Sequence, residues 1–415
     1  MSEIFIAFLK LLLFPISIII YTLSGFFYRN EKKIVFGAQK NSFTDNTMHL
    51  YLYVYENEKH LIPIWISQDR KLIKFLRSKG CKAHLRWSLK GFYHTATAKY
   101  WFIITTTADI LHFTSKKATI INLWHGIPLK KIYFDSDNKF ELKRYHNPNL
   151  IQKYVLNPHI YRLSDFMVSP SYQISKDSFS SALKVPIDKC LNLGLPRNDI
   201  FFYDDFTLNN WLDKWCSVQV KHVISEAKNA DFVWLYMPTW RENNPNFLIN
   251  LNIDFIFLNQ CLKSKNEILV VKLHQYTPLS TLKLINNLSN ILIYPTNEDI
   301  YPFLKFSDSL ITDYSSIYID YLLLNKPIYH FCFDLIDFQK RARSFYYDFD
   351  TFSAGNIILD IKGFYEIFQI THIDRYAEKR KKLIKYFFDL NKGNSSKLVT
   401  NFIKNINDES AKNNI

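Results

Sequence analysis

The sequence predicts an α/β protein with two doubly wound parallel-sheet domains that face a cleft. Short apolar runs, rich in β-branched and aromatic residues, alternate with stretches of helical spacing, as parallel strands joined by helices do. The runs form two successive sets, and 415 residues are enough for two domains. Several runs end abruptly in polar clusters, which is typical of the carboxyl edge of an open α/β sheet.

The elements follow in chain order from these runs. The first domain, 31–205, has predicted strands at 33–38, 60–67, 100–105, 118–123, 166–170 and 190–193. The second, 206–365, has them at 232–237, 268–273, 290–294, 309–312 and 327–331. Helical spacing marks 69–78, 278–288 and 317–324. The boundary is expected near 199–209, where an aromatic, acidic stretch follows a strand. Helices are expected at 366–404 and a polar tail at 405–415.

The N-terminal segment, 1–30, is predicted to associate with a membrane. Residues 4–28 are apolar apart from Lys10 and a few small or hydroxyl residues, and they are long enough to span a bilayer. Because Lys10 and Pro15 interrupt the run, a helix that lies in one leaflet remains an alternative, as does a helix packed on the protein itself. The basic residues Arg29, Lys32 and Lys33 favour a cytoplasmic location for the domains that follow.

The charge indicates which kinds of partner to expect, and the cysteine content indicates the cellular compartment. The formal charge of +14 is spread along the chain, which fits either a solvated basic surface or a face toward anionic lipid or a phosphate-rich substrate. Nucleic acid is not expected as a partner, since the sequence has no nucleic-acid-binding motif. The five cysteines are scattered and lack metal-site spacing, which fits a reducing cytoplasm.

A histidine follows the predicted strand at 118–123. The run ends in Trp124, His125 and Gly126, and Lys130 comes shortly after. Histidine is suited to accept a proton near neutral pH, and glycine allows a tight turn or a close approach to a ligand. We therefore expect a catalytic site here, with a purely structural histidine beside a turn as the alternative.

Two strand ends of the second domain carry side chains suited to phosphate. Thr239 and Arg241 come just after the strand at 232–237, and a guanidinium matches phosphate oxygens. Lys272 and His274 are two residues apart, so on an extended strand they share a face, and both can donate to an anion. A surface salt bridge or unrelated polar residues would be the ordinary explanation of each pair taken alone.

A third strand end leads into a predicted helix start. Thr312 and Asp313 are followed by Ser315 and Ser316, where hydroxyls and backbone N–H groups can form an anion site. Asp320, about one turn further on, is placed to accept from ribose hydroxyls. Plain helix capping, with an exposed Asp320, is the alternative.

The first domain has one further candidate turn, and several classes of site are excluded. Arg197 and Asp199 follow the strand at 190–193, where a tight turn alone would suffice. The sequence contains no GxxxxGK[ST] and no GxGxxG, which disfavours an ATPase and a dinucleotide oxidoreductase. No metal site is expected, because no His, Asp or Glu group has suitable spacing.

Together these motifs make the chain resemble the CDP-glycerol glycerophosphotransferase family, the primases and polymerases of teichoic acids and some phosphate-containing capsules. The resemblance covers roughly 33–390 in the family's order, with one departure, Gln275 in place of a proline. The matching pieces are Val35-Phe36-Gly37, Asp45-Asn46, Trp124-His125-Gly126-Ile127-Pro128-Leu129-Lys130, Gly194-Leu195-Pro196-Arg197-Asn198-Asp199, Pro238-Thr239-Trp240-Arg241, Lys272-Leu273-His274 and Thr312-Asp313-Tyr314-Ser315-Ser316.

The resemblance implies a GT-B-like fold, an acceptor-side first domain and a nucleotide-donor second domain. It implies transfer of glycerol phosphate from CDP-glycerol or a related CDP-alditol to a lipid-linked or polymeric glycan acceptor at the bacterial cytoplasmic membrane, without cofactor or metal. His125 and His274 are then the expected catalytic residues. The expected donor-binding residues are Thr239, Arg241, Lys272, Thr312, Asp313, Ser315, Ser316 and Asp320, and the expected acceptor-side residues are Trp124, Gly126, Lys130, Arg197 and Asp199.

Three other functions stay open on the sequence alone. A CDP-ribitol ribitolphosphotransferase would use the same site. A GT-B sugar-nucleotide glycosyltransferase of capsule or lipopolysaccharide synthesis needs the same diphosphate site and base. A non-catalytic membrane-bound scaffold with a degenerate nucleotide site is the third, and the presence of both histidines counts against it.

Overall fold

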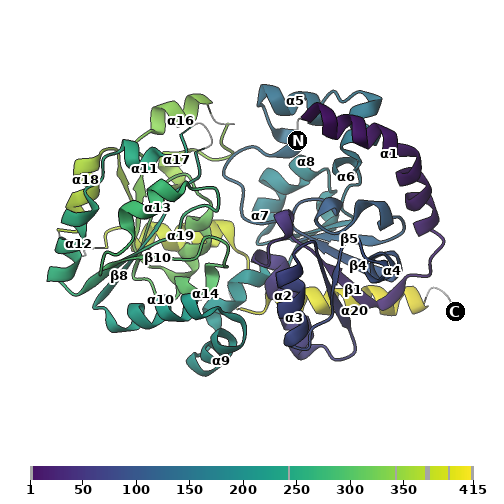
Figure 1. Cartoon of the computed structure of the whole chain (residues 1–415), viewed down its shortest axis with the longest axis horizontal. Coiled ribbons are helices and arrows are strands. Elements are labelled where there is room, and N and C mark those ends of the chain that lie inside the picture. The colour runs from purple at the N-terminus through teal and green to yellow at the C-terminus, as the bar shows by residue number, and fades with distance from the viewer. Residues whose placement is uncertain (1–2, 242–243, 342–343, 370–373, 391–392, 413–415) are drawn as a thin grey trace. The chain divides into compact units, whose positions relative to one another are not determined.

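The computed structural model describes residues 3–241, 244–341, 344–369, 374–390 and 393–412, and their contacts divide them into two compact units (Figure 1). Unit 1 comprises Met1–His125, Lys131–Asp199 and Phe388–Ile415. Unit 2 comprises Gly126–Lys130 and Ile200–Phe387. The main division at Asp199 lies at the start of the predicted boundary region. The short segment 126–130 belongs to unit 2, although the residues on either side of it belong to unit 1. The C-terminal segment 388–415 belongs to unit 1, although the residues before it belong to unit 2.

Unit 1 is a doubly wound parallel sheet, as predicted. In its described part the strand order is β3-β2-β1-β4-β5-β6-β7, and the order reverses between β1 and β4. Val35 of β1 pairs with Ile64 of β2 on one side and Trp101 of β4 on the other. The strands are β1 (Asn30–Phe36), β2 (Ile62–Ser67), β3 (Ala83–Leu85), β4 (Ala98–Ile103), β5 (Thr119–Asn122), β6 (Phe166–Ser169) and β7 (Cys190–Asn192).

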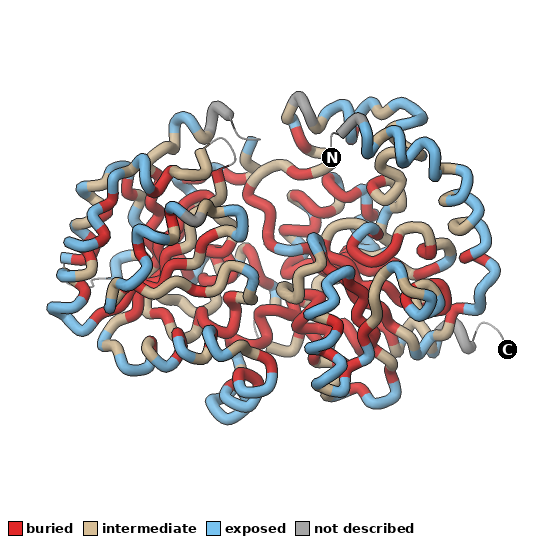
Figure 2. The backbone as a smooth tube through the Cα atoms, in the orientation of Figure 1, coloured by how far each residue is buried: buried red, intermediate tan, exposed pale blue. Residues whose placement is uncertain are grey.

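Helices cover both faces of this sheet, so its central strands are apolar and almost completely buried (Figure 2). Side-chain caps fix where some helices begin: Asp69 accepts from the first N–H groups of α3, and Ser88 does so for α4. The helices are α1 (Glu3–Ser24), α2 (Asp45–Asn57), α3 (Arg70–Ser78), α4 (Leu89–Thr97), α5 (Lys139–Tyr145), α6 (Pro158–Tyr161), α7 (Tyr172–Ile174), α8 (Ser180–Leu183) and α20 (Ser395–Lys412).

Unit 2 repeats this architecture. The described strands run in the order β10-β9-β8-β11-β12-β13, all parallel, with the reversal between β8 and β11. Trp234, Tyr236 and Leu269 are buried in its core. The strands are β8 (Phe232–Met237), β9 (Glu267–Val271), β10 (Ile291–Ile293), β11 (Ser309–Thr312), β12 (Ile328–Phe331) and β13 (Asn356–Ile358).

The helices of unit 2 include those predicted at 278–288 and 317–324, which appear as α13 and α15, and several short ones. Thr312 at the end of β11 leads through a short loop into α15. The helices are α9 (Asp205–Trp215), α10 (Val218–Asn229), α11 (Phe247–Asn250), α12 (Phe255–Ser264), α13 (Leu279–Ile285), α14 (Tyr301–Leu304), α15 (Ile317–Tyr321), α16 (Leu335–Arg341), α17 (Phe349–Phe352), α18 (Ile361–Glu366) and α19 (Ala377–Phe387).

The predicted strands are all present, with ends shifted by up to a few residues. Two strands, β3 and β13, were not predicted. Each has three residues and lies at the edge of its sheet, so neither is long enough to give a periodic signal. The predicted C-terminal helical region also divides, because α19 groups with unit 2 and α20 with unit 1.

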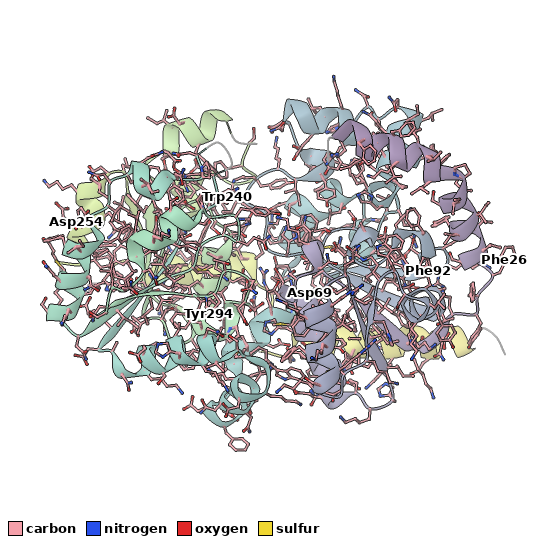
Figure 3. All side chains as sticks on the ribbon, in the orientation of Figure 1. Phe26, Asp69, Phe92, Trp240, Asp254 and Tyr294 are labelled. Carbon is pink, nitrogen blue, oxygen red and sulfur yellow. The ribbon has the colours of Figure 1, made fainter. Side chains whose placement is uncertain are left out.

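The apolar N-terminal segment forms α1, which packs along the surface of unit 1. Lys10 donates to the carbonyl of Leu156 at 2.7 Å, and the ring of Tyr21 stacks on His112 with centroids 5.5 Å apart. The helix is long and apolar enough to cross a membrane, yet most of its apolar side chains are exposed (Figure 2). Just beyond it, Phe26 is 80% exposed and points away from the ribbon (Figure 3).

Candidate functional site

His125 lies directly after β5 on a turn that hydrogen bonds hold in place. Asn122, the last residue of the strand, accepts from the N–H of Trp124 at 2.9 Å. The amide of Asn46 donates to the carbonyls of Leu123 and Trp124 at 3.2 and 3.0 Å. Trp124 has a φ of 54°, a conformation that bulky residues rarely adopt, and these bonds stabilise it.

The imidazole of His125 is oriented by a backbone carbonyl and an indole. Its Nδ1 lies 3.0 Å from the carbonyl oxygen of Ile104, and since a carbonyl only accepts, Nδ1 carries the proton. In the neutral ring the basic lone pair is therefore on Nε2. The ring stacks on Trp124 with centroids 4.4 Å apart and is exposed to solvent. This is the arrangement that a general base requires.

A buried carboxylate supports the carbonyl that orients His125. Asp109 accepts from the N–H groups of Ile104 and Thr105 at 3.0 and 2.7 Å. Burial raises the pKa of Asp109 to about 6. The backbone of Asp109 lies so close to Gly37 that a Cβ there would come within 2.4 Å of its carbonyl oxygen. Asp109 was not predicted, since it does not follow a strand directly.

The residues after His125 pack in unit 2. Gly126 has a φ of 150°, within the region that favours glycine. The carbonyl of Leu129 accepts from the N–H of Tyr346 at 2.7 Å. The ammonium of Lys130 lies 4.2 Å from the centroid of the Phe338 ring. The acceptor-side roles predicted for Gly126 and Lys130 stay predictions.

Arg197 and Asp199 are buried inside unit 1. Arg197 donates to the Asp45 carboxylate at 2.8 Å, and its backbone N–H donates to the Asn46 side chain at 3.1 Å. Asp199 accepts from the first two N–H groups of α20, those of Ser395 and Ser396, each at 2.8 Å. These bonds give both residues a structural role: Arg197 supports the Asn46 that holds the His125 turn, and Asp199 caps α20.

In unit 2, Arg241 lies between two carboxylates. It donates to Asp313 at 2.8 Å and forms a two-pronged pair with Asp334 at 2.7 and 2.9 Å. Burial lowers the pKa of Arg241, but the bonds to Asp334 and Asp313 outweigh burial and raise it overall. The guanidinium carbon also lies 4.7 Å from the ring centroid of Phe247 and 4.6 Å from that of Phe333. Its charge is therefore compensated within the protein.

The two threonines predicted at the donor site are bonded into the same network. Asp313 accepts from both the backbone N–H and the hydroxyl of Thr239. Thr312 is fully buried, and its hydroxyl donates to the carbonyl of Met237 at 2.6 Å, which ties the ends of β8 and β11 together. Arg241, Thr239 and Asp313 thus fix the loop that leads into α15.

Lys272 points toward a loop of backbone carbonyls. Its ammonium donates to the carbonyls of Pro295 and Glu298, the latter at 2.8 Å, and lies 5.1 Å from the Tyr294 ring centroid. Burial lowers the pKa of Lys272 to about 8. The cation therefore stays largely protonated at pH 7.

His274 follows Lys272 on the same strand end, and its ring stacks on Trp240 with centroids 5.4 Å apart. Trp240 is labelled in Figure 3. The His274 Nδ1 accepts from the N–H of Tyr276 at 3.3 Å. A neutral ring held this way carries its proton on Nε2, so it can donate to an anion.

Ser315 and Ser316 are half-buried and directly precede α15. Ser316 is the N-terminal cap residue, and its hydroxyl makes no capping bond to the helix. Asp320 is fully buried and accepts from the hydroxyl of Tyr301 at 3.1 Å. It is not the exposed helix carboxylate of the alternative interpretation, and its role beside the ribose stays a prediction.

Asp334, like Asp109, was not predicted from the sequence. It lies three residues after β12 and holds both Arg241 and the hydroxyl of Tyr314. The rule that identified Asp313, a polar residue just beyond the carboxyl end of a strand, would have found it. Within the described residues no group of His, Cys, Asp and Glu is arranged to hold a metal ion.

Comparison with known proteins identifies the family. The model of the CDP-glycerol:poly(glycerophosphate) glycerophosphotransferases matches residues 19–405. The chain belongs to this family. It is 27% identical over 396 residues to the teichoic acid poly(glycerol phosphate) polymerase of Bacillus spizizenii, covering 94% of this chain and 96% of that protein. It is 26% identical to the teichoic acid glycerol-phosphate transferase of Staphylococcus aureus, covering 86% and 88%.

The fold agrees with a solved structure. The wall teichoic acid polymerase TagF superposes with a TM-score of 0.73 at 23% identity, covering 97% of this chain and 98% of that one. These comparisons therefore confirm three predictions for this glycerophosphotransferase: its family, its GT-B-like fold and its enzyme class. The predicted roles of individual site residues are not tested by these likenesses and stay predictions.

Proposed function

We propose that the chain transfers glycerol phosphate from CDP-glycerol to an acceptor hydroxyl in the synthesis of a teichoic-acid-like or capsular polymer. The acceptor oxygen forms a bond to the β-phosphorus. The bond from that phosphorus to the bridging oxygen breaks, and CMP leaves with the electron pair. Membership of the family and the likeness to glycerol-phosphate polymerases over nearly the whole chain support this donor.

The observation that carries the mechanism is the hydrogen bond from His125 Nδ1 to the carbonyl of Ile104. It places the basic lone pair on Nε2 of an exposed ring at the carboxyl edge of the sheet. In the proposed mechanism Nε2 takes the proton of the acceptor hydroxyl as that oxygen attacks. A positioned general base typically contributes ~10²–10⁴-fold in rate.

Donor charge is stabilised, in this proposal, by residues of unit 2. His274 donates from Nε2 to a phosphate oxygen, and the start of α15 at Ser315 and Ser316 supplies hydroxyls and backbone N–H groups. Lys272 adds a positive charge near the same strand edge. Arg241 acts mainly through the loop that it holds, because two carboxylates already compensate its charge.

The acceptor, in this proposal, is lipid-linked or polymeric and is met at a membrane. Teichoic acid synthesis is a cell-envelope process, and α1 presents an apolar stripe to solvent at Phe5, Phe8, Leu12, Ile16, Ile19 and Leu23. Since Lys10 and Tyr21 hold both halves of α1 against unit 1, we propose that the helix lies in one leaflet on the cytoplasmic face rather than crossing the bilayer.

The test is release of CMP from CDP-glycerol by the purified full chain with detergent-solubilised membrane acceptor. Release that EDTA spares and that His125→Ala abolishes is the expected result. A donor panel belongs in the same experiment, because a ribitol-phosphate primase of B. spizizenii is 24% identical over 90% of this chain. Release from CDP-ribitol or a UDP-sugar, with none from CDP-glycerol, would overturn the proposed donor.

A further inference from the structure

A single peptide group joins the proposed general base to a buried carboxylate. The Ile104–Thr105 peptide lies just after β4, and its carbonyl oxygen, that of Ile104, accepts from Nδ1 of His125 at 3.0 Å. The N–H of the same peptide, that of Thr105, donates to the Asp109 carboxylate at 2.7 Å. The groups therefore follow one another in the order carboxylate, peptide N–H, peptide carbonyl and imidazole.

Several contacts hold the carboxylate of Asp109 in this arrangement. Besides the Thr105 N–H, it accepts from the N–H of Ile104 at 3.0 Å and from the hydroxyl of Thr105 at 2.5 Å. The backbone carbonyl of Asp109 accepts from Arg86 at 2.8 Å. The same carbonyl lies so close to Gly37 that a Cβ there would come within 2.4 Å of its oxygen. This close approach explains why a glycine follows β1.

The end of β5 fixes the peptide from the neighbouring strand. The N–H of Leu123 donates to the carbonyl of Ile103 at 2.8 Å, and the side-chain amide of Asn122 donates to the carbonyl of Thr105 at 3.2 Å. These two bonds lie on either side of the Ile104–Thr105 peptide, so it has little freedom to turn. The carboxylate therefore acts on the imidazole through the polarity of the peptide and not by moving the backbone.

A carboxylate at the N–H end of a peptide makes its carbonyl a stronger acceptor, because hydrogen bonds in a chain polarise one another. The effect is larger where water is excluded, and Asp109 and Ile104 are only 3% and 4% exposed. A stronger acceptor at Nδ1 stabilises the imidazolium more than the neutral ring, since a charged donor forms the stronger hydrogen bond. The carboxylate thus favours uptake of a proton at Nε2.

Asp109 is largely ionised at pH 7. Burial raises its pKa to about 6, while its hydrogen bonds and the charge of Arg86 oppose this rise. Tyr133 faces the carboxylate as a neutral phenol, because burial raises its pKa. His112, whose Nδ1 lies 2.9 Å from the hydroxyl of Thr107, is neutral because burial lowers its pKa to about 3. The charge next to the peptide N–H is therefore that of the carboxylate.

We propose that Asp109 is a positioning residue for His125: through the Ile104–Thr105 peptide its charge orients the imidazole and stabilises the positive charge that the ring acquires in the reaction. No proton passes through the peptide. As the acceptor oxygen bonds to phosphorus, its proton moves to Nε2, Nδ1 keeps its own proton and Asp109 stays ionised. Asp109 has this role only if His125 is the general base, so the proposal rests on the proposed function.

The test measures how readily His125 takes a proton, without substrate. The full-length protein carries histidine labelled with ¹³C at Cε1, and the His125 resonance, identified as the one missing in His125→Gln, is followed against pH. Asp109→Asn keeps the shape of the side chain and an oxygen that accepts from both N–H groups, and it removes the charge. We expect the midpoint of the titration to move to lower pH by about half a unit or more.

Asp165→Asn is the matched control. Asp165 also accepts from a backbone N–H of unit 1, that of Ile120 at 2.7 Å, but at the start of β5. This variant should leave the midpoint for His125 unchanged. If Asp109→Asn folds poorly, Asp109→Ser takes its place, since serine lacks the charge and can still accept from an N–H group. A midpoint that stays at the wild-type value in the folded variant would overturn the proposal.

Turnover gives a second readout of Asp109→Asn. We expect kcat for CMP release from CDP-glycerol to fall at least tenfold, with KM for CDP-glycerol within threefold of wild type. The acid limb of kcat should move to lower pH, because a less basic ring stays unprotonated further into acid. A lower kcat with an unmoved limb would indicate a merely structural role and overturn the proposal. Absence of CMP release by the wild type would instead overturn the proposed function, while the titration of His125 still decides whether Asp109 acts on it.

Discussion

His125 and His274 are held in opposite tautomers. Nδ1 of His125 donates to the carbonyl of Ile104, whereas Nδ1 of His274 accepts from the N–H of Tyr276. When neutral, the first ring offers a basic Nε2 and the second a proton-bearing Nε2. Two residues of one type are thus prepared by the backbone for different tasks, one to accept a proton and one to donate a hydrogen bond.

This difference predicts different responses to the same substitution. His125→Gln should lower kcat by ~10²–10⁴-fold, since an amide cannot act as a base near neutral pH. His274→Gln should retain at least tenfold more activity than His274→Ala, because the amide N–H can still donate. Steady-state rates of CMP release measure both. Equal loss in His274→Gln and His274→Ala would contradict the donor role.

Arg241→Lys should destabilise unit 2 strongly. A lysine can reach one carboxylate at a time, so either the buried Asp313 or the partly exposed Asp334 would lose its partner. Breaking a buried pair, as with Asp313, costs about 3–5 kcal/mol. Urea denaturation gives the free energy of unfolding. Arg70→Lys, at an exposed position on α3, is the control and should change it by less than about 0.5 kcal/mol.

The lowered pKa of Lys272 predicts that the free energy of unfolding depends on pH. Its folded-state pKa of about 8 lies below the ordinary lysine pKa of 10.5, so between these pH values the unfolded chain binds more protons than the folded one. Stability contributed by this site therefore rises with pH across that window, by up to about 3 kcal/mol. The difference in unfolding free energy between wild type and Lys272→Met isolates this contribution. A difference that stays flat from pH 8 to 10.5 would contradict the lowered pKa.

Asp199→Ala should weaken the attachment of α20 to unit 1. The carboxylate satisfies two N–H groups at the start of this helix, and losing such a cap costs about 0.5–2 kcal/mol, with burial favouring the upper end. Hydrogen exchange of 395–412 should accelerate in this variant. Asp360→Ala removes the cap of α18 in unit 2 and should leave exchange of α20 unchanged.

The exposed stripe of α1 predicts which substitutions abolish membrane binding. Phe8→Lys, Leu12→Lys and Ile16→Lys together should prevent flotation with vesicles that contain anionic lipid, since a charge in the apolar region is costly. The control places three lysines at Phe206, Val218 and Ile256, which lie in unit 2 and are at least as exposed. If α1 instead crosses the bilayer, a covalent link between the positions of Lys10 and Leu156 should block binding.

The sequence predicts the sheets well because a buried parallel strand has a continuous run of apolar residues. It also places the candidate site residues at strand ends, since the strands β5, β8 and β11 end at Asn122, Met237 and Thr312. The partners of those residues could not be predicted in this way. Asp334 and Asp109 act through contacts with Arg241 and Ile104, and such contacts depend on tertiary packing rather than on local pattern.

The same limit explains the residues whose environment differs from expectation. Arg197, Asp199 and Arg241 look like ligand-binding residues because they are charged and follow strands. In the structure, their charges are matched by Asp45, by the start of α20 and by two aspartates. A single sequence does not show whether a strand-end charge meets a partner from the protein or from a substrate.

The way in which the chain divides between the units has a consequence for biosynthesis. Unit 1 needs α20, whose Val399 and Ile403 are fully buried, so it is incomplete until residues 395–412 have left the ribosome. Unit 2 depends only on 126–130 and 200–387, all of which emerge earlier. The half that is synthesised first is therefore finished last, and during that interval the apolar α1 is already available to a membrane. Lipid contact can thus precede completion of the half that carries His125.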